Sequence, residues 1–302
     1  MRVVRLLTLN SPVNVRSIFG QGGTVNSLIL ALILGFLSIG LSDIPAHAQP
    51  RARDFGRYPN FGEVLLPPPT PDDLIRMKAA GISEKDVSDV EGFVRSSFPA
   101  IDQAAQEYLA KAGLKFKTPA IRYYGYRNIK APSNCGELPL ENAVYCYEDN
   151  TINYDIIFLT KVIKVVKEKT KTDGKYAVMA VMSHEMGHAV DYKWARLLSG
   201  VGSKAWGMLY ELLLERNADC FAGAALSKIV LDQTGKAAVP DREREKSAAL
   251  LEGRLALYAI QGDRSDRYYP PGEERMGIFK KGFEEGTGTC YELKLSNEKK
   301  AR

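Results

Sequence analysis

Histidine is scarce in this chain, which has three among its 302 residues. His47 falls in an N-terminal stretch that has the features of a cleaved leader, so the rest of the chain has only His184 and His188. Both belong to one motif of the form H-E-x-x-H. A site built from several scattered histidines is therefore excluded, and any imidazole chemistry must involve this pair.

A large excess of charge of one sign is also absent. The formal net charge is +5 at pH 7, and three of the basic residues, Arg2, Arg5 and Arg16, lie in the expected leader. Nucleic-acid-binding domains carry a strong basic patch, so we expect no nucleic-acid partner.

Long apolar runs are missing as well. The apolar stretch from Ser27 to Leu41 has about 15 residues, fewer than the roughly 20 of a membrane-spanning helix. It follows a basic segment and precedes the small-x-small sequence Ala46-His47-Ala48, which predicts a secretory leader over 1–48. The alternative is an uncleaved anchor, which would be the only contact with a membrane. We expect a periplasmic or secreted protein.

Cysteine is limited to four residues, Cys135, Cys146, Cys220 and Cys290, and none forms a C-x-x-C pair. This argues against a four-cysteine zinc site. An even number after a secretory leader predicts two disulfides. Three pairings are possible, of which Cys135–Cys146 would be local, and buried free thiols are the alternative.

The histidine pair has the spacing of a metal site. Residues four apart share one face of a helix, so His184 and His188 can direct imidazole nitrogens at one Zn²⁺. Glu185 beside them is the catalytic candidate, a general base that takes a proton from a metal-bound water. The alternative is that the histidines simply cap or fill a helix. We expect one Zn²⁺ per chain.

A third metal ligand must come from another residue type, because a catalytic zinc has three protein ligands and one open position. Glu215 and Asp219 are four apart among apolar and small residues, where a carboxylate pair requires a cation. We expect Glu215 to bind the metal and Asp219 to hold a ligating histidine. Asp191 is rejected, since a rise of about 1.5 Å per residue places it too far from His184.

Three separated segments together resemble the bacterial family of "putative neutral zinc metallopeptidases", which is gluzincin-like. The first contains Cys135-Gly136, Tyr145-Cys146 and Tyr154-Asp155. The second contains the H-E-x-x-H motif and Glu215 through Gly223. The third runs from Arg275 to Phe283 and ends at Cys290.

This resemblance implies a zinc-dependent endopeptidase with a zincin-like fold and a peptide or protein substrate. It also implies the disulfides Cys135–Cys146 and Cys220–Cys290. In gluzincin-like enzymes a strand just before the active-site helix binds extended substrate, although here the strands could form an ordinary hairpin. The chain departs from the family at Ala189 and Asp191, where the family often has histidine and glutamine.

The predicted fold is α+β, mainly helical, with a small antiparallel or mixed sheet ahead of the active-site helix. The expected domains are the leader 1–48, a Pro/Gly/Arg-rich linker 49–71, a single domain 72–294 and a charged tail 295–302. Strands are expected at Ile121–Tyr124, Ala143–Tyr147 and Ile152–Phe158. Helices are expected at Pro71–Ala80, from Glu84 to an interruption at Pro99, from there to about Ala112, at Lys175–Leu198, from Ser203 beyond Gly223, from Asp241, and at Gly272–Phe283.

Two other functions stay open. A non-catalytic zinc-binding recognition protein would have no use for Glu185, which is not a ligand. A zinc amidase that cleaves cell-wall peptides would use the same residues. An oxyanion donor is also required, and nothing in the sequence selects among Tyr192, Tyr210, Tyr268 and Tyr269.

Overall fold

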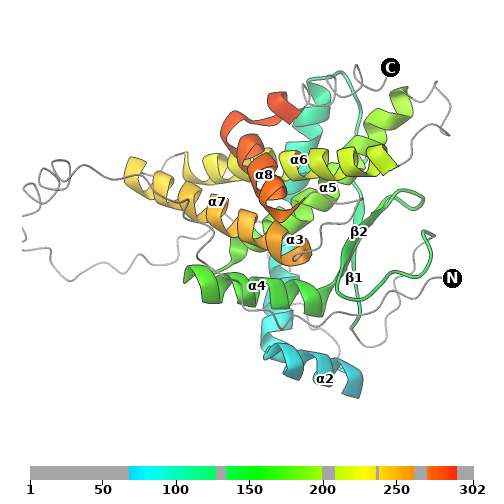
Figure 1. Ribbon diagram of the computed structural model, residues 1–302, viewed down its shortest axis with the longest axis vertical. Coiled ribbons are helices and arrows are strands. Elements are labelled where there is room, and N and C mark those ends of the chain that lie inside the picture. The colour runs from blue at the N-terminus through cyan, green and yellow to red at the C-terminus, as the bar shows by residue number, and fades with distance from the viewer. Residues whose placement is uncertain (1–67, 127–133, 199–207, 236–237, 262–270, 291–302) are drawn as a thin grey trace, which may run out of the picture. The chain divides into compact units, whose positions relative to one another are not determined.

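The described residues are mainly helical, with a small sheet near the middle of the chain. The computed structural model describes residues 68–126, 134–198, 208–235, 238–261 and 271–290 (Figure 1). The elements are α2 (Pro71–Ala80), α3 (Glu84–Ala110), β1 (Ala120–Tyr124), β2 (Ala143–Cys146), β3 (Thr151–Asp155), α4 (Ile156–Thr170), α5 (Lys175–Leu198), α6 (Met208–Thr234), α7 (Val239–Gln261) and α8 (Gly272–Glu285). The predicted α+β class is confirmed.

The three strands form a mixed sheet in the order β1-β3-β2. β3 pairs with β1 in parallel and with β2 antiparallel, so that Tyr145 lies opposite Ile152 and Val144 opposite Asn153. β3 is buried along its whole length, which is expected for a central strand. β2 is therefore an edge strand of the sheet that the structure describes.

The third predicted strand is too long. It ends at Asp155, and Ile156 to Phe158 form the first turn of α4, a helix that the sequence analysis missed. The Asp155 carboxylate accepts hydrogen bonds from the backbone N–H groups of Ile157 and Phe158, at 3.1 and 3.3 Å. This N-cap starts the helix inside a β-branched run that resembles a strand.

Local capping signals position the first two helices as predicted. Thr70 and Asp73 form a capping box at the start of α2, and Ser83 and Asp86 form one at the start of α3. Gly81 ends α2 in the left-handed conformation, with φ 63°, which glycine adopts without a steric cost.

The predicted interruption at Pro99 is wrong, because α3 continues through it. A proline inside a helix removes one backbone hydrogen bond and costs about 3 kcal/mol. Here the helix carries buried apolar side chains on both sides of the proline, including Val94, Phe98 and Ile101. Each such side chain contributes roughly 1.5–3 kcal/mol when buried, so packing outweighs the local penalty.

Helix α5 lies at the centre of the packing and runs over the predicted residues. It contacts α3, α4, α6, α7 and β2, and residues 176–187 are all buried. A helix buried on every side must carry apolar residues all round, which makes the charged H-E-x-x-H segment conspicuous. Glu252 of α7 holds the start of the helix, since its carboxylate accepts the Tyr176 N–H at 2.8 Å.

Several predictions fall on residues that the structure does not describe. These are the leader 1–48, the linker up to residue 67, the tail 295–302, the turn at 200–202 and the capping role of Ser203. The boundaries 72–294 stay a prediction. In the described ranges, no helix has the length and apolarity needed to cross a membrane.

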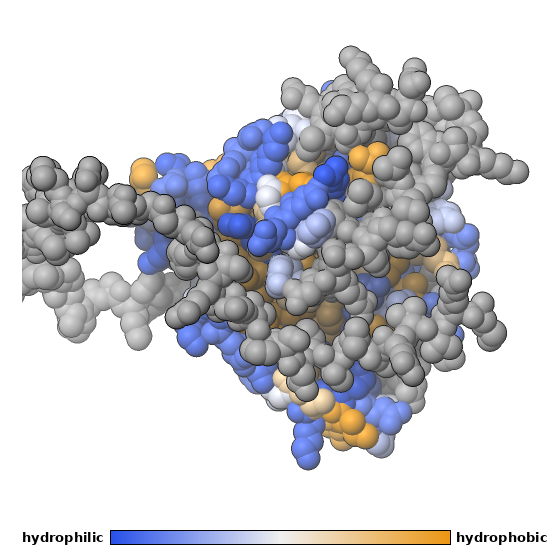
Figure 2. Space-filling view, in the orientation of Figure 1, coloured by the Kyte–Doolittle hydropathy of each residue, from blue (hydrophilic) through white to orange (hydrophobic). Residues whose placement is uncertain are grey.

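The visible face of the described residues is mostly hydrophilic (Figure 2). An apolar patch lies at the position of α2, where Leu74 and Ile75 are 47% and 67% exposed. Scattered exposed apolar side chains are normal on protein surfaces.

Candidate metal centre

Helix α5 brings the two histidines of the motif together. The ring centroids of His184 and His188 are 4.7 Å apart, and their Nε2 atoms are 3.1 Å apart. His184 is 5% exposed and Glu185 is 6% exposed. Two imidazoles directed at one point inside a largely buried segment are the arrangement that the i, i+4 spacing predicts.

Glu215 of α6 completes a triangle with the histidines. Its Oε2 lies 3.3 Å from His184 Nε2, and its Oε1 lies 3.5 Å from His188 Nε2. Ligands bound tetrahedrally to zinc at roughly 2.0–2.1 Å are about 3.3–3.4 Å from one another. The separations and the donor set, two imidazoles and one carboxylate, therefore fit a catalytic zinc site.

Glu185 also lies close to the histidines, since one of its carboxylate oxygens is within 4.8 Å of a nitrogen of each. The Glu215 oxygens lie 3.3 Å from His184 Nε2 and 3.5 Å from His188 Nε2. The Glu185 carboxylate also has another partner, because its Oε2 accepts the backbone N–H of Tyr145 at 2.8 Å. The geometry thus favours Glu215 as the third metal ligand and leaves Glu185 beside the triangle.

The approach of α6 to α5 depends on small residues at their crossing. A side-chain carbon at Gly187 would lie 2.7 Å from the Cα atom of Ala218, closer than real side chains come. Gly187 lies between the two histidines, and Ala218 lies between Glu215 and Asp219. The glycine of the histidine motif and the alanine of the acidic motif therefore allow the two helices to bring their side chains together.

Asp219 binds the far side of His184. Its Oδ1 lies 2.9 Å from His184 Nδ1, and its side chain is fully buried. A carboxylate in this place accepts the Nδ1–H and leaves Nε2 free to face a metal. The structure thus places Asp219 where the sequence analysis expected it.

Arg275 of α8 is the residue that the sequence analysis missed. Its Nε and Nη2 donate to the two oxygens of Asp219, each at 2.7 Å, and Nη2 also lies 3.5 Å from Glu215 Oε2. The residue is only 2% exposed. Arg275 is the first residue of the third segment that resembles the family. A single arginine in that segment was the only sign in the sequence of a partner for Asp219.

Close backbone packing and a disulfide hold α8 against α6. A side-chain carbon at Gly223 would clash with the Phe279 carbonyl oxygen, and one at Gly282 would clash with that of Cys220. Cys220, next to Asp219, is joined to Cys290 in a disulfide. These contacts position α8 so that Arg275 reaches Asp219 at the candidate metal centre.

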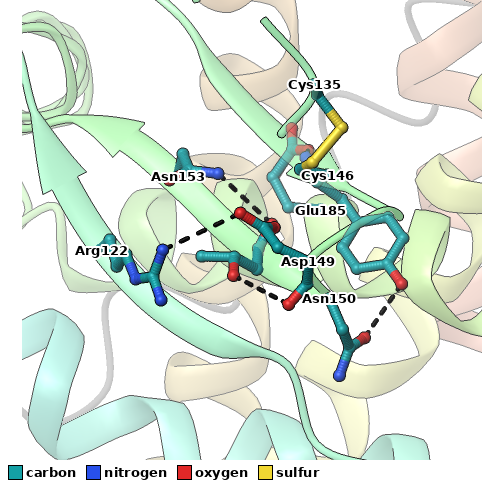
Figure 3. Close-up of a disulfide and its surroundings, with 9 residues drawn as sticks. Arg122, Cys135, Cys146, Asp149, Asn150, Asn153 and Glu185 are labelled. Carbon is teal, nitrogen blue, oxygen red and sulfur yellow. Dashed lines mark hydrogen bonds and ion pairs between the residues drawn. A yellow bond between two sulfur atoms is a disulfide. The ribbon is translucent and has the colours of Figure 1, made fainter. Parts of the chain in front are cut away.

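Strand β2 approaches Glu185 from the other side. The Tyr145 N–H that Glu185 accepts faces away from β3, because Val144 and Cys146 supply the alternate pairs to β3. A second disulfide joins Cys146 to Cys135, and Figure 3 shows it near Glu185. Both disulfides have the pairing that the family resemblance implied.

The resemblance placed the substrate strand just before the active-site helix, and the structure changes that detail. The last strand before α5 is β3, which is central and followed by α4. The backbone groups of a central strand are used on both sides. The strand that reaches the centre from the sheet edge is β2.

Burial and charge set the ionisation of the centre. Burial alone lowers the pKa of His184, but the hydrogen bonds to Asp219 and Glu215 outweigh it and raise the pKa to about 10. Burial lowers the pKa of His188 to about 4. Burial raises the pKa of Glu215, yet the nearby histidines outweigh this and lower it to about 2. Glu215 is thus an ionised carboxylate facing a neutral His188, and both forms can bind a metal, whereas His184 must release its Nε2 proton when a metal binds.

Desolvation acts on Glu185 in the direction that a general base needs. Burial raises the pKa of its carboxyl group to about 7, against the opposing effect of His184. A carboxylate with this pKa accepts and returns a proton near neutral pH.

The tyrosines considered as oxyanion donors are only partly described. Tyr192 lies one turn after His188, and its ring packs against those of Tyr145 and Tyr147. The side chain of Tyr210 and all of Tyr268 and Tyr269 lie outside the described part of the chain.

Comparisons with known proteins agree with this centre. Residues 67–290 match the family described as "Putative neutral zinc metallopeptidase". The chain is 29% identical over 153 residues to the "Uncharacterized protein YpfJ" of Escherichia coli strain K12 and, to the same extent, to the protein of that name from E. coli O6:H1 strain CFT073.

Those alignments cover 47% of this chain and 50% of each relative, so the chain spans about half the length of the curated relatives it matches. No solved structure gives a significant match. The family match, by contrast, takes in all of α5, α6 and α8, the helices that build the centre. By the extent of that match, the chain belongs to the neutral zinc metallopeptidase family.

Proposed function

We propose that this chain is a zinc-dependent endopeptidase in which His184, His188 and Glu215 hold one Zn²⁺ and Glu185 is the general base. The observation that carries the proposal is the grouping of the donor atoms: the two histidine Nε2 atoms are 3.1 Å apart, Glu215 Oε2 is 3.3 Å from that of His184, and Glu215 Oε1 is 3.5 Å from that of His188. The Glu185 carboxylate lies beside them. The zinc, when bound, supplies Lewis acidity toward water and the scissile carbonyl.

Glu185 would take the proton of the attacking water and deliver it to the leaving amine. Its raised pKa, about 7, suits both halves of that transfer. The Tyr145 N–H, at 2.8 Å from Oε2, orients the carboxylate. Without that contact, a glutamate on a helix has several rotamers available.

Asp219 and Arg275 would act through His184 and touch no substrate. Asp219 holds the imidazole with Nε2 directed at the triangle, and Arg275 holds Asp219. Carboxylates that fix a ligating histidine raise metal affinity and set the ring orientation.

An extended peptide would lie along β2. The Ala143 and Tyr145 peptide groups face away from β3. Their N–H groups donate to Asn142 Oδ1 and Glu185 Oε2, so pairing with a peptide strand would use their outward carbonyl groups. Because Glu185 contacts this same edge, a peptide that pairs there passes the candidate base. This supports a peptide or protein substrate. A nucleic-acid partner is not expected.

The compartment proposed is periplasmic or extracellular. Two disulfides, Cys135–Cys146 and Cys220–Cys290, occur in the described residues, and disulfides persist mainly in oxidising compartments. The N-terminal leader remains the expected route of export.

The test is metal analysis of the purified chain together with cleavage profiling on a mixed peptide library. We expect about one zinc per chain, cleavage within peptides, loss of cleavage after removal of zinc with a chelator, and recovery on adding zinc back. Stoichiometric zinc with no cleavage of any library member would instead support a recognition protein. Cleavage of peptidoglycan peptides alone would support a cell-wall amidase.

A further inference from the structure

A group of three tyrosines lies beside the candidate metal centre, and none of the roles above uses them as a group. Tyr192 is on α5, and Tyr145 and Tyr147 are on β2 and in the turn that follows it. The Tyr192 ring centroid lies 6.3 Å from that of Tyr145 and 5.2 Å from that of Tyr147. We refer to these three residues as the tyrosine shelf.

The tyrosine shelf continues the face of α5 that carries the histidines. His184, His188 and Tyr192 are spaced by four residues and therefore lie along one face, with Tyr192 about 6 Å further along the axis than His188. On the opposite side, Tyr145 donates its backbone N–H to Glu185. Both elements that form the shelf thus also hold groups of the centre.

The shelf is held in place and partly open. The Tyr145 hydroxyl donates to the Asn150 side chain at 3.0 Å. Tyr147 is 53% exposed, and its ring is inclined by 32° to that of Tyr192. The shelf therefore presents a large ring at the surface, two residues after the Tyr145 N–H that contacts Glu185.

We propose that the tyrosine shelf is a specificity subsite that receives a large apolar or aromatic side chain of a peptide close to the scissile bond. This inference rests on the proposed peptidase function and names its substrate class. A peptide paired along β2 would carry its side chains past Tyr145 and Tyr147, since strand side chains alternate with a period of two. Aromatic rings favour offset or edge-on contact with another ring and bind apolar groups by burial.

The experiment measures binding and cleavage separately. The probes are fluorescein-labelled nonapeptides of Gly, Ser and Ala with a single central Phe, Leu, Ala or Asp. Binding is measured by anisotropy in the Glu185→Gln protein, where turnover is blocked, and kcat/KM is measured in the protein with Glu185 intact. Tyr147→Ala and Tyr192→Ala are compared with Tyr147→Phe and Tyr192→Phe, which keep the ring.

We expect Phe and Leu peptides to bind at least ~10-fold more tightly than the Asp peptide, and either alanine variant to reduce this ratio to below ~3-fold. The phenylalanine variants should keep the ratio. Ile75→Ala, which removes an exposed apolar side chain on α2, is the matched control and should change nothing. A general loss of folding, checked by circular dichroism, would lower binding of all four peptides alike.

The outcomes test the proposed subsite and the proposed peptidase function independently. Cleavage with equal kcat/KM for Phe and Asp peptides, or a preference that survives both alanine variants, overturns the subsite and leaves the peptidase. A Phe preference in binding that both alanine variants abolish, without cleavage of any peptide, supports the subsite and contradicts the peptidase.

Discussion

Arg275 donates two hydrogen bonds to Asp219, from Nε to Oδ2 and from Nη2 to Oδ1, each at 2.7 Å. The same Oδ1 lies 2.9 Å from His184 Nδ1. One buried carboxylate therefore connects α8, α6 and α5 at the candidate metal centre. Because the guanidinium is planar, a two-point contact fixes the carboxylate plane as well as its position.

Removing Arg275 should destabilise the fold. Arg275→Leu leaves Asp219 as a buried carboxylate without its cation, and breaking one side of a buried pair typically costs about 3–5 kcal/mol. Urea unfolding measures the change in the free energy of unfolding. Lys280→Ala, on the exposed face of the same helix in a pair with Glu284, should unfold like the parent. An Arg275→Leu protein as stable as the parent would refute the structural role.

Two glycines of α8 should respond to alanine in opposite directions. At Gly282 a methyl group would meet the Cys220 carbonyl, so Gly282→Ala should cost at least ~2 kcal/mol. At Gly277 nothing lies within 4 Å, and alanine in a helix is favoured by about 0.5–1 kcal/mol. Thermal or urea unfolding of the two variants decides this. Equal effects would mean that the α6–α8 contact is looser than described.

The zinc affinities of three carboxylate variants test the ligand set. Glu215→Ala should abolish tight binding, because it removes one corner of the donor triangle. Asp219→Asn should weaken binding by ~10–100-fold through the orientation of His184. Asp191→Ala should leave it largely unchanged, since α5 is helical throughout and holds Asp191 about 10 Å along from His184. Tight binding by Glu215→Ala together with loss in Asp191→Ala would reverse the assignment.

The Glu185→Gln variant separates metal binding from catalysis. Glutamine keeps the shape of the side chain and still accepts the Tyr145 N–H, but it cannot take a proton from water. We expect near-stoichiometric zinc and a loss of kcat of at least ~10²-fold. Metal analysis and steady-state kinetics on the same preparation check both parts. Full activity in this variant would eliminate Glu185 as the general base.

Disulfide mapping tests the pairing and the export of the chain, and unfolding of cysteine variants tests the stability that each bond contributes. Non-reducing peptide maps of the exported protein should show Cys135–Cys146 and Cys220–Cys290. The bonds close loops with sequence separations of 11 and 70, which the chain-entropy model values at about 3 and 4 kcal/mol. Double alanine variants of each pair should therefore differ in unfolding free energy, the second being less stable. Free thiols in an exported sample would contradict the pairing and the compartment together.

Local signals in the sequence were sufficient for much of the fold. The capping boxes at Thr70 and Ser83 mark helix starts because each satisfies orphan backbone donors with nearby side chains. Pro99 and the start of α4 were misjudged for different reasons. At Pro99, burial of apolar side chains on both sides outweighs the local cost of the proline. At α4 the signal is local, because Asp155 caps Ile157 and Phe158, but the β-branched run around it resembles a strand.

The candidate metal centre likewise depends partly on local sequence spacing and partly on tertiary packing. The spacing of His184 with His188 and of Glu215 with Asp219 follows from the sequence alone, because 3.6 residues per turn place i and i+4 on one face. Whether the two pairs meet depends on how closely α5 and α6 approach at Gly187, a distance between segments that no local rule specifies. The tertiary structure alone brings Arg275 onto Asp219 and the Tyr145 N–H onto Glu185, since these contacts join residues 56 and 40 positions apart.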